Sequence, residues 1–519
     1  MSASERYAAL EGERQPYIDR ARACAKVTIP ALIRDEGKDG SSKLDTPYQS
    51  IGARGVNNLA SKLLLSLFPP HTPPFTLPID SVTRQEMTQR EGMQGEVDQA
   101  LKSIVDRVQN DIETRGVRTS VFEIFKHGIV AGNALLYAPP GGGNCRVYAL
   151  TNYVIKRSPD GTLLEIVIKE KIAHSALPPE IKNAIPTDKL PEAPENVNGK
   201  PSVPVDAQNK EHDLFTHIFL SDGQYHIHQE IENITVPGSE GSFLPVDMPY
   251  IPHRFVRVDG ESYGRSYCEE YLGDLASLED LSKAILEFTA IAARVNPLIN
   301  PSGVTSVNAY MKAANGAPLV GKAGDVTFAQ VDKYNDMRSV MDYMKEIEKR
   351  LAFAFLLNTS IQRGGDRVTA EEIRFMAREL EDALGGIYSI QSQEFQLPMV
   401  LIFIKQSGMK IPKQITLKVV TGMDALGKGQ DLANLDAFVM GIVKVAPQAA
   451  SAVNWNEYMT RRANALNVEI TGLIKSPEEQ QAEAQQAQMA QMAQQGLPNA
   501  INQAGQMAQK SMENRKDGE

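Results

Sequence analysis

A long helical region, residues 271–406, constrains the fold of this chain most strongly. Between Asp336 and Leu357 the apolar residues recur three or four positions apart, which is the spacing of one face of an α-helix. These residues are Met337, Met341, Met344, Ile347, Leu351 and Phe355. The spacing predicts a helix over 336–357.

A glycine-containing loop, residues 359–368, interrupts the helical pattern. Its adjacent Gly364 and Gly365 make continuous helix or strand costly. A new helix is predicted from Thr369, because threonine is a good N-cap and Glu372 occupies the capping-box position. The two helices would form a stiff hairpin that presents its tip to a target. The tip carries the charged residues Arg363, Asp366 and Arg367.

Apolar stripes extend the helical prediction in both directions. The helix from Thr369 continues through Ile373, Met376, Leu380, Leu384 and Ile387. An earlier helix over 271–295 would be about 35 Å long at 1.5 Å per residue. Its stripe consists of Leu278, Leu281, Ile285, Phe288, Ala292 and Val295. Between the helices, residues 302–332 predict a turn-rich insert with short strands at 303–307 and 325–328.

The first 260 residues predict a mixed α+β region, in which helices pack against a mainly antiparallel sheet. Helical patterns cover 5–28, 48–68, 96–114 and 118–131. Aliphatic runs bounded by turns predict strands at 133–138, 146–151, 154–157, 163–172, 213–220, 225–231 and 250–258. After the long helices, the pattern predicts one strand at 413–420 and further helix over 431–474. The Gln/Ala/Met-rich tail after Pro477 is expected to be partly helical and mobile.

Composition limits the function. The chain has 519 residues and a formal net charge of −10, which argues against a protein that coats nucleic acid non-specifically. It does not exclude a conduit for DNA. The cysteines Cys24, Cys145 and Cys268 lie far apart and match neither a zinc spacing nor a disulfide framework. No signal peptide and no apolar run of roughly 18 residues is found, so we expect a soluble, intracellular product.

Three polar motifs could be interpreted as chemical sites, but a simpler structural interpretation is favoured for each. Gly141–Gly143 lacks the Lys and Ser/Thr of a phosphate loop, so a hairpin turn is favoured and ATP hydrolysis is not expected. Four histidines could bind a metal, but no nearby cysteine or tightly spaced carboxylate supports this, and partly exposed sheet residues are favoured. They are His212, His217, His226 and His228. Acidic residues at 269, 270, 274, 279 and 280 indicate a solvated or subunit-facing helix surface rather than paired catalytic carboxylates.

Ser262 lies at the centre of a Gly-x-Ser-x-Gly string, Gly260–Gly264. A nucleophile elbow needs an apolar strand before the serine and a helix directly after it. A strand does precede the string, but Asp259 and Gly260 form a turn and Gly264–Tyr267 delays the helix. A turn is therefore favoured, and a serine hydrolase using Ser262 remains an alternative.

Several strings together resemble the head-to-tail connector, or portal, proteins of short-tailed bacteriophages of the T7 type. The resemblance covers nearly the whole chain. It is carried by Tyr17–Arg22, Gln49–Leu65, Phe68–Pro69, Tyr263–Tyr267 and Ser277–Leu281.

The resemblance implies a non-enzymatic, ring-forming protein, usually a dodecamer, at one vertex of the virion capsid and made in the host cytoplasm. Double-stranded DNA would be pumped through its channel by a separate terminase and would later leave by the same route. Other implied partners are the major capsid and scaffolding proteins, tail adaptor and tube proteins, and internal core proteins. No cofactor, metal or membrane is implied. A non-viral helical scaffold protein remains a second alternative.

The family architecture of wing, two-helix stem, clip and crown can be mapped by the order of elements. The mapping gives a wing over 1–265, stem helices over 266–295 and 333–358, a clip over 296–332, a channel loop over 359–369, a long helix returning to the wing over 370–429, a crown over 430–475 and a tail over 476–519. Within the loop, the residues expected to line the DNA channel are Gln362, Arg363, Gly364, Gly365, Asp366 and Arg367.

Overall fold

The computed structural model divides the chain into two units, Met1–Ala425 and Leu426–Glu519. Each unit is described by itself. The described residues are 1–38, 40–69, 73–77, 93–184, 211–293, 297–328, 334–357, 379–380, 382–408, 418–419, 435–444 and the single positions 453, 455, 458, 459, 462 and 507.

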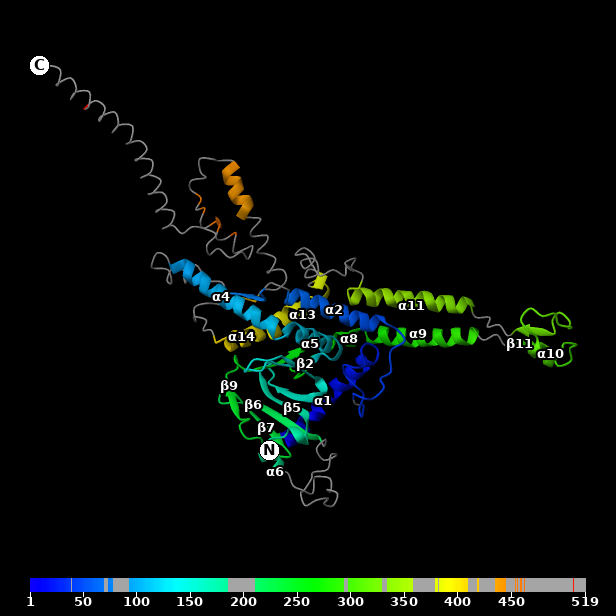
Figure 1. Ribbon diagram of the computed structural model, residues 1–519, viewed down its shortest axis with the longest axis horizontal. Helices are drawn as coiled ribbons and strands as arrows, with labels where there is room; N and C mark the ends of the chain where they lie inside the picture. The colour runs from blue at the N-terminus through cyan, green and yellow to red at the C-terminus, as the bar shows by residue number, and fades with distance from the viewer. Residues whose placement is uncertain are drawn as a thin grey trace, which may run out of the picture. The chain divides into compact units, whose positions relative to one another are not determined.

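Among the described residues of the first unit there are four antiparallel sheets, of which two have more than two strands (Figure 1). The larger has the order β4-β5-β6-β7-β8, with β9 also paired to β7, and the smaller has the order β10-β2-β3. The strands of the larger sheet are β4 (Tyr153–Arg157), β5 (Leu163–Ala173), β6 (Glu211–Ser221), β7 (Gln224–Ile231), β8 (Ile234–Thr235) and β9 (Gly241–Phe243). The smaller sheet contains β2 (Asn133–Tyr137), β3 (Arg146–Ala149) and β10 (Tyr250–Arg254).

The prediction of a mainly antiparallel sheet is therefore confirmed. The hairpin turn expected at Gly141–Gly143 is also confirmed, because β2 and β3 pair directly across it. Gly142 and Gly143 have φ angles of 79° and 114°, a region that favours glycine.

Four helices belong to the same part of the unit: α1 (Ala3–Lys26), α2 (Ile51–Leu67), α4 (Met93–Thr114) and α5 (Val117–Ala131). The helices α1 and α5 pack against the sheets, and α2 and α4 pack against α5. A capping box starts α1, since Ser2 and Glu5 exchange hydrogen bonds between side chain and backbone. In α2, the predicted aliphatic face is fully buried at Leu59, Leu63 and Leu67. The helix α5 ends at Gly132, whose φ of 73° forms a left-handed C-cap. These helices confirm the α+β prediction.

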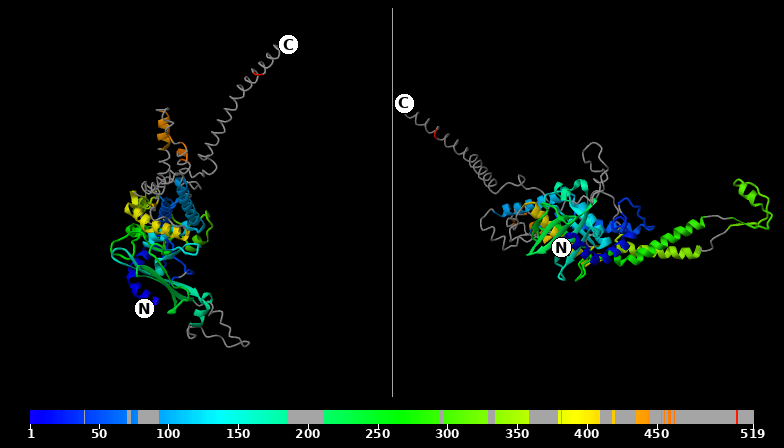
Figure 2. Two further views of the ribbon diagram at one scale, coloured as in Figure 1. Left: turned by 90° about the vertical axis from the view of Figure 1, so that its left-hand side faces the viewer. Right: turned by 90° about the horizontal axis from the view of Figure 1, so that it is seen from below.

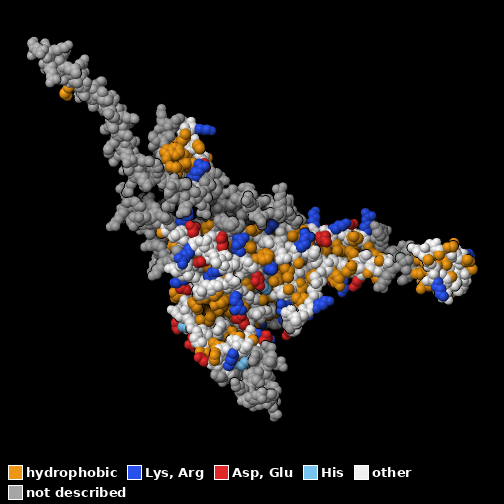
Figure 3. All heavy atoms as spheres, viewed as in Figure 1, with side chains coloured by type: hydrophobic (Ala, Val, Ile, Leu, Met, Phe, Trp, Pro, Cys, Tyr) orange, Lys and Arg blue, Asp and Glu red, His pale blue; other side chains and the backbone are white. Residues whose placement is uncertain are grey.

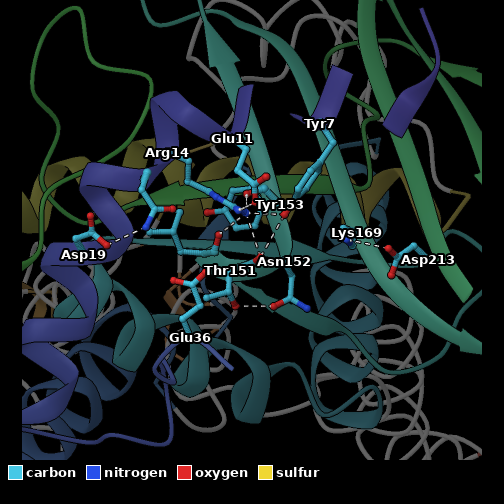
Figure 4. Close-up of polar contacts among 12 residues, drawn as sticks. Tyr7, Glu11, Arg14, Asp19, Glu36, Thr151, Asn152, Tyr153, Lys169 and Asp213 are labelled. Carbon is cyan, nitrogen blue, oxygen red and sulfur yellow. Dashed lines mark hydrogen bonds and ion pairs between the residues drawn. The ribbon is translucent and has the colours of Figure 1, made fainter. Parts of the chain in front are cut away.

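Arg14 anchors α1 to the chain that connects β3 with β4 (Figure 4). Its Nη1 donates to the carbonyl oxygens of Thr151 and Tyr153, both at 3.0 Å, and to the Tyr7 hydroxyl at 2.8 Å. Its Nη2 forms an ion pair with Glu11 at 2.9 Å. Because the side chain is only 3% exposed, these bonds replace the water that a guanidinium would otherwise hold.

Two helices form an antiparallel pair further along the first unit (Figures 1 and 2). They are α9 (Leu272–Ala292), preceded by the short α8 (Tyr267–Glu270), and α11 (Tyr334–Ala354). An ion pair of 2.8 Å between Arg350 and Asp274 joins them. The helices predicted at 271–295 and 336–357 are thus present.

The segment between α9 and α11 contains β11 (Pro297–Ile299), α10 (Val307–Lys312) and β12 (Val326–Phe328). The strand predicted at 325–328 is confirmed and pairs with β11. The strand predicted at 303–307 is wrong. There the amides of Val304 and Thr305 donate to the carboxylate of Asp325, at 2.9 and 3.1 Å, so they are not available to a ladder.

Beyond the predicted loop, the described chain contains α13 (Gly386–Gln391), the π-helical turn η4 (Ser392–Gln396) and α14 (Leu397–Gln406). Leu380 and Leu384 are buried, as their stripe predicts. The continuous helix expected from Thr369 is interrupted, however, because Gly385 adopts a φ of 51°. The turn η4 directs Glu394 toward Arg254, with an ion pair of 2.9 Å.

A two-stranded pairing of β1 (Phe75–Thr76) with β13 (Lys418–Val419) confirms part of the strand predicted at 413–420. In the second unit, residues 435–444 are helical, in agreement with the helix predicted over 431–474. Tyr458 donates a hydrogen bond of 2.6 Å to Asp436. Apart from Met507, the tail 476–519 lies outside the described residues.

Candidate functional site

Ser262 accepts a hydrogen bond of 3.2 Å from the backbone N–H of Arg157. The next helix, α8, does not begin until Tyr267 and is capped by Ser266. Within the described part of the chain, no histidine is hydrogen-bonded to Ser262. The local geometry is a turn that ties the loop to β4, without the adjacent base that a serine nucleophile requires.

In the described structure, the four histidines of the larger sheet contact carboxylates or aromatic rings and do not form a shared metal site. His217 contacts Glu165 at 2.8 Å, His228 contacts Glu230 at 3.1 Å, and His226 stacks on Phe219. His212 is buried and contacts His174 at 3.2 Å, so the expectation of partial exposure is wrong for this residue. Among the residues that the structure describes, no group of three suitable side chains could hold a metal ion.

All three cysteines are free and buried. Burial raises the pKa of Cys24 to about 11 and also raises that of Cys145, so both remain thiols at neutral pH. They are poor candidates for a nucleophile or a metal ligand.

The acidic side of α8 and α9 is partly used inside the chain. Glu269 pairs with Arg20 and Arg265, both at 3.3 Å, and Asp274 pairs with Arg350. Glu279 accepts hydrogen bonds from the amides that precede α2, at Tyr48 and Gln49. These carboxylates hold elements together, and no two of them are hydrogen-bonded as a catalytic pair in the described structure.

The helix pair α9–α11 buries apolar side chains in one part and exposes them in another. Near the sheets it is buried, at Leu275, Leu278, Ile347 and Leu351. Further along, Leu286 and Ile291 of α9 are 56% and 57% exposed. Met341, which belongs to the predicted apolar face of α11, is half-exposed, as is Tyr343. Figure 3 shows apolar side chains gathered over this part of the molecule. Isolated exposed apolar residues are common, but a run along two paired helices marks an interaction surface.

The insert 297–328 has even less apolar burial. Many of its large apolar side chains are exposed. They are Leu298, Val304, Val307, Met311, Leu319, Val320 and Phe328. A fold of this size with so much exposed apolar surface is suited to contacts with other chains.

The C-terminal end of α11 is held by an unusual cap. The N–H of Leu357 donates to the Ala352 carbonyl at 2.7 Å, and that of Leu356 to the Phe353 carbonyl at 3.1 Å, which is the Schellman pattern. The left-handed position is filled by Leu356, with a φ of 55°, where glycine is usual. Asn58 and Lys62 of α2 donate to the carbonyls that this cap leaves free.

The six predicted channel-lining residues, Gln362 to Arg367, lie outside the described residues. The described chain resumes at Glu379, whose carboxylate forms an ion pair of 2.7 Å with Lys62. Sequence reasoning missed Asn58 and Lys62. Both lie inside the Gln49–Leu65 string, but α2 also carries Arg54, Asn57 and Ser61, so the local pattern did not single them out.

No helix in the described ranges has both the length and the apolar character needed to cross a membrane.

The chain belongs to the bacteriophage head to tail connecting protein family, whose model matches residues 1–473. It is 39% identical to the portal protein of Enterobacteria phage T3 and 40% identical to that of Escherichia phage T7. Each match covers 92% of this chain and 88% of the relative. The portal protein of Enterobacteria phage SP6 is 30% identical, over 91% of this chain and 89% of the relative. The resemblance seen in the sequence is confirmed.

Solved structures of gene transfer agent particles are weakly similar. The neck of an empty particle matches with a TM-score of 0.37 and 14% identity, over 75% of this chain and 86% of that chain. The native virion gives a TM-score of 0.33, over 75% of this chain and 85% of that chain. These scores are too low to carry an argument.

Proposed function

We propose that this protein forms the portal ring at one capsid vertex, through which double-stranded DNA is packaged and later ejected. The single observation that carries the proposal is the similarity to portal proteins along nearly the whole chain, at 39% and 40% identity. The protein catalyses no reaction itself, and a separate terminase supplies the energy. It acts in the virion, as a homo-oligomer for which a dodecamer is expected.

The segments of the chain take the family's parts in order. Residues 1–265 form the wing, α9 and α11 lie within the stem segments 266–295 and 333–358, and the insert 296–332 is the clip. The exposed apolar residues of α9 and α11 support this assignment, because neighbouring copies in a ring would cover them. The exposed apolar residues of the insert suit docking of terminase and then of tail proteins. Residues 370–429 return to the wing, and 430–475 form the crown, close to capsid, scaffolding and internal core proteins.

The segment 359–369 is the channel loop in this proposal, with Arg363 and Arg367 contacting passing DNA. Phosphate contacts of this kind are electrostatic and independent of base sequence. A net charge of −10 on each chain limits how tightly DNA is retained, so the contacts are few and transient. Such a balance suits a conduit better than a DNA-coating protein.

The function is tested by assembling procapsids with and without this chain and measuring DNA protected from nuclease after terminase and ATP are added. We expect protection only when the chain is present. Equal protection without it would contradict the proposal. For the loop, Arg363→Ala with Arg367→Ala should reduce packaging or retention of DNA, whereas Lys171→Ala, which alters an exposed pair in the larger sheet, should not. Unchanged packaging and retention in the double variant would remove the loop from the account.

A further inference from the structure

The end of α11 rests on one face of α2. Gly55, Asn58, Leu59 and Lys62 lie on that face, at helical spacings of three and four residues. A Cβ atom added to Gly55 would lie 2.6 Å from Cγ of Phe355, so only glycine permits this approach. Leu59 is fully buried beneath the contact. The approach brings the polar ends of Asn58 and Lys62 within reach of the cap of α11.

Two side chains of α2 satisfy the cap. Asn58 Nδ2 donates to the carbonyl oxygens of Phe355 and Leu356, at 2.9 and 3.0 Å. Lys62 Nζ donates to the carbonyl of Leu356 at 2.9 Å. A leucine in the left-handed region is strained by its Cβ, so it persists only where its surroundings determine it. The three hydrogen bonds from α2 are such surroundings.

Lys62 also reaches the chain on the far side of the segment 358–378. Its Nζ lies 2.7 Å from Oε2 of Glu379, while its side chain is 8% exposed and that of Glu379 is 22% exposed. A buried ammonium needs such partners, because its charge is costly away from water. One lysine is therefore bonded at once to Leu356 and to Glu379.

We propose that Asn58 and Lys62 are positioning residues that fix both ends of the segment 358–378 against α2. The bond to Leu356 sets where the chain leaves α11, and the ion pair with Glu379 sets where it returns. The spacing of the two ends is then fixed by the reach of a single side chain anchored in α2. The value of this arrangement for DNA passage rests on the proposed role of the segment as the channel loop.

The arrangement is tested by amide hydrogen exchange of the assembled protein, followed in residues 351–357 and 379–384. Lys62→Met keeps most of the aliphatic stem but removes the three donors. We expect exchange in both segments to become about tenfold faster, the effect of losing one charge-assisted hydrogen bond. Lys62→Arg restores donors and charge and should return exchange to within about twofold of the unchanged protein.

Two further variants keep the test decisive. Lys169→Met removes an exposed ion pair with Asp213 and should leave both segments unchanged. If Lys62→Met does not fold, Glu379→Met should speed exchange at 379–384, while the bonds of Lys62 and Asn58 to Leu356 still protect 351–357. If Lys62→Met does fold, adding Glu379→Met to it should increase the exchange rate at 379–384 little further, because both changes remove the same ion pair.

Unchanged exchange at both ends in a folded Lys62→Met protein would overturn the proposal, as would an effect at only one end. Failure of the proposed channel role can be distinguished from failure of the positioning proposal. If exchange changes as expected while the nuclease-protection assay is unaffected by both Lys62→Met and the double arginine variant, the positioning stands and the channel role of the segment falls.

Discussion

At the scale of single residues, buried charges determine how elements join. Arg14 makes five hydrogen-bond or ion-pair contacts, of which two stay within α1. The other three join α1 to the carbonyls of Leu150, Thr151 and Tyr153. Lys62 performs a similar task between α2, α11 and Glu379. In both cases a cationic side chain donates hydrogen bonds to backbone carbonyls, which fixes its direction in addition to pairing its charge.

Replacing Arg14 by methionine should destabilise the first unit. The change leaves the carbonyls of Leu150, Thr151 and Tyr153 without this donor in a buried site, at a cost of about 3 kcal/mol. Chemical denaturation followed by circular dichroism would measure it. Arg22→Met on the same helix removes an exposed hydrogen bond of 3.3 Å to the Arg34 carbonyl and contacts of 3.7 Å to exposed carboxylates, and should cost about 0–1 kcal/mol. Equal losses for the two variants would contradict the role of Arg14.

Glu165 gives a pH prediction. Burial raises the pKa of Glu165, but hydrogen bonds from His217 and Arg6 outweigh this and hold the pKa at about 2. A pKa depressed by folding contributes stability that is present above the unfolded value, near 4.5, and lost as the pH falls through about 2. Glu165→Gln should therefore be less stable than the unchanged protein above pH 4.5, by about 1–2 kcal/mol. The difference should shrink between pH 4.5 and 2, and a constant difference would contradict it.

At the scale of elements, the pair α9–α11 has an apolar surface that a single chain leaves uncovered. Leu286 and Ile291 lie on α9, and Met341 and Tyr343 lie on α11, all about half exposed. Exposed apolar residues of this kind contribute little to the stability of one chain but become buried when neighbouring copies pack.

Leu286→Glu should weaken ring assembly without unfolding the chain. A charge buried at an interface is costly, so we expect the dissociation constant between subunits to rise at least about tenfold. Mass photometry would measure the distribution of oligomers, and the melting temperature would report the fold. Leu164→Glu, at an exposed position in β5 outside the proposed stem, serves as the control. Intact rings in the Leu286 variant would remove this face from the interface.

Sequence patterns predicted the elements that depend on local periodicity. The helices α1, α2, α9 and α11 and the strands β4 to β7 follow from the spacing of their apolar residues, whereas the short strands β8 and β9 were not predicted. The strand expected at 303–307 was wrong because Asp325, some twenty positions later, takes its amides. The break at Gly385 and the contacts of Lys62 likewise depend on backbone conformation or partners that no local spacing encodes.

The channel-lining residues stay a prediction, since Gln362–Arg367 lie outside the described residues. Their expected role came from the order of elements in the family and not from a pattern in the loop itself. Two arginines separated by three residues are too common to identify a DNA contact.

At the scale of the whole molecule, family membership and exposed surface point to the same assembly. The chain matches portal proteins over 92% of its length, and its helix pair and insert expose apolar residues in the described structure. A closed ring covers such surfaces because each copy packs one face against a different, complementary face of the next copy.

Electron microscopy of the purified protein tests this central claim most directly. The account predicts uniform rings with a central hole, and class averages with rotational symmetry that place many copies around one axis. Leu286→Glu should reduce the number of rings in the same preparation. A field of single chains or irregular particles at concentrations well above those of assembly, with the chain still folded, would contradict the account.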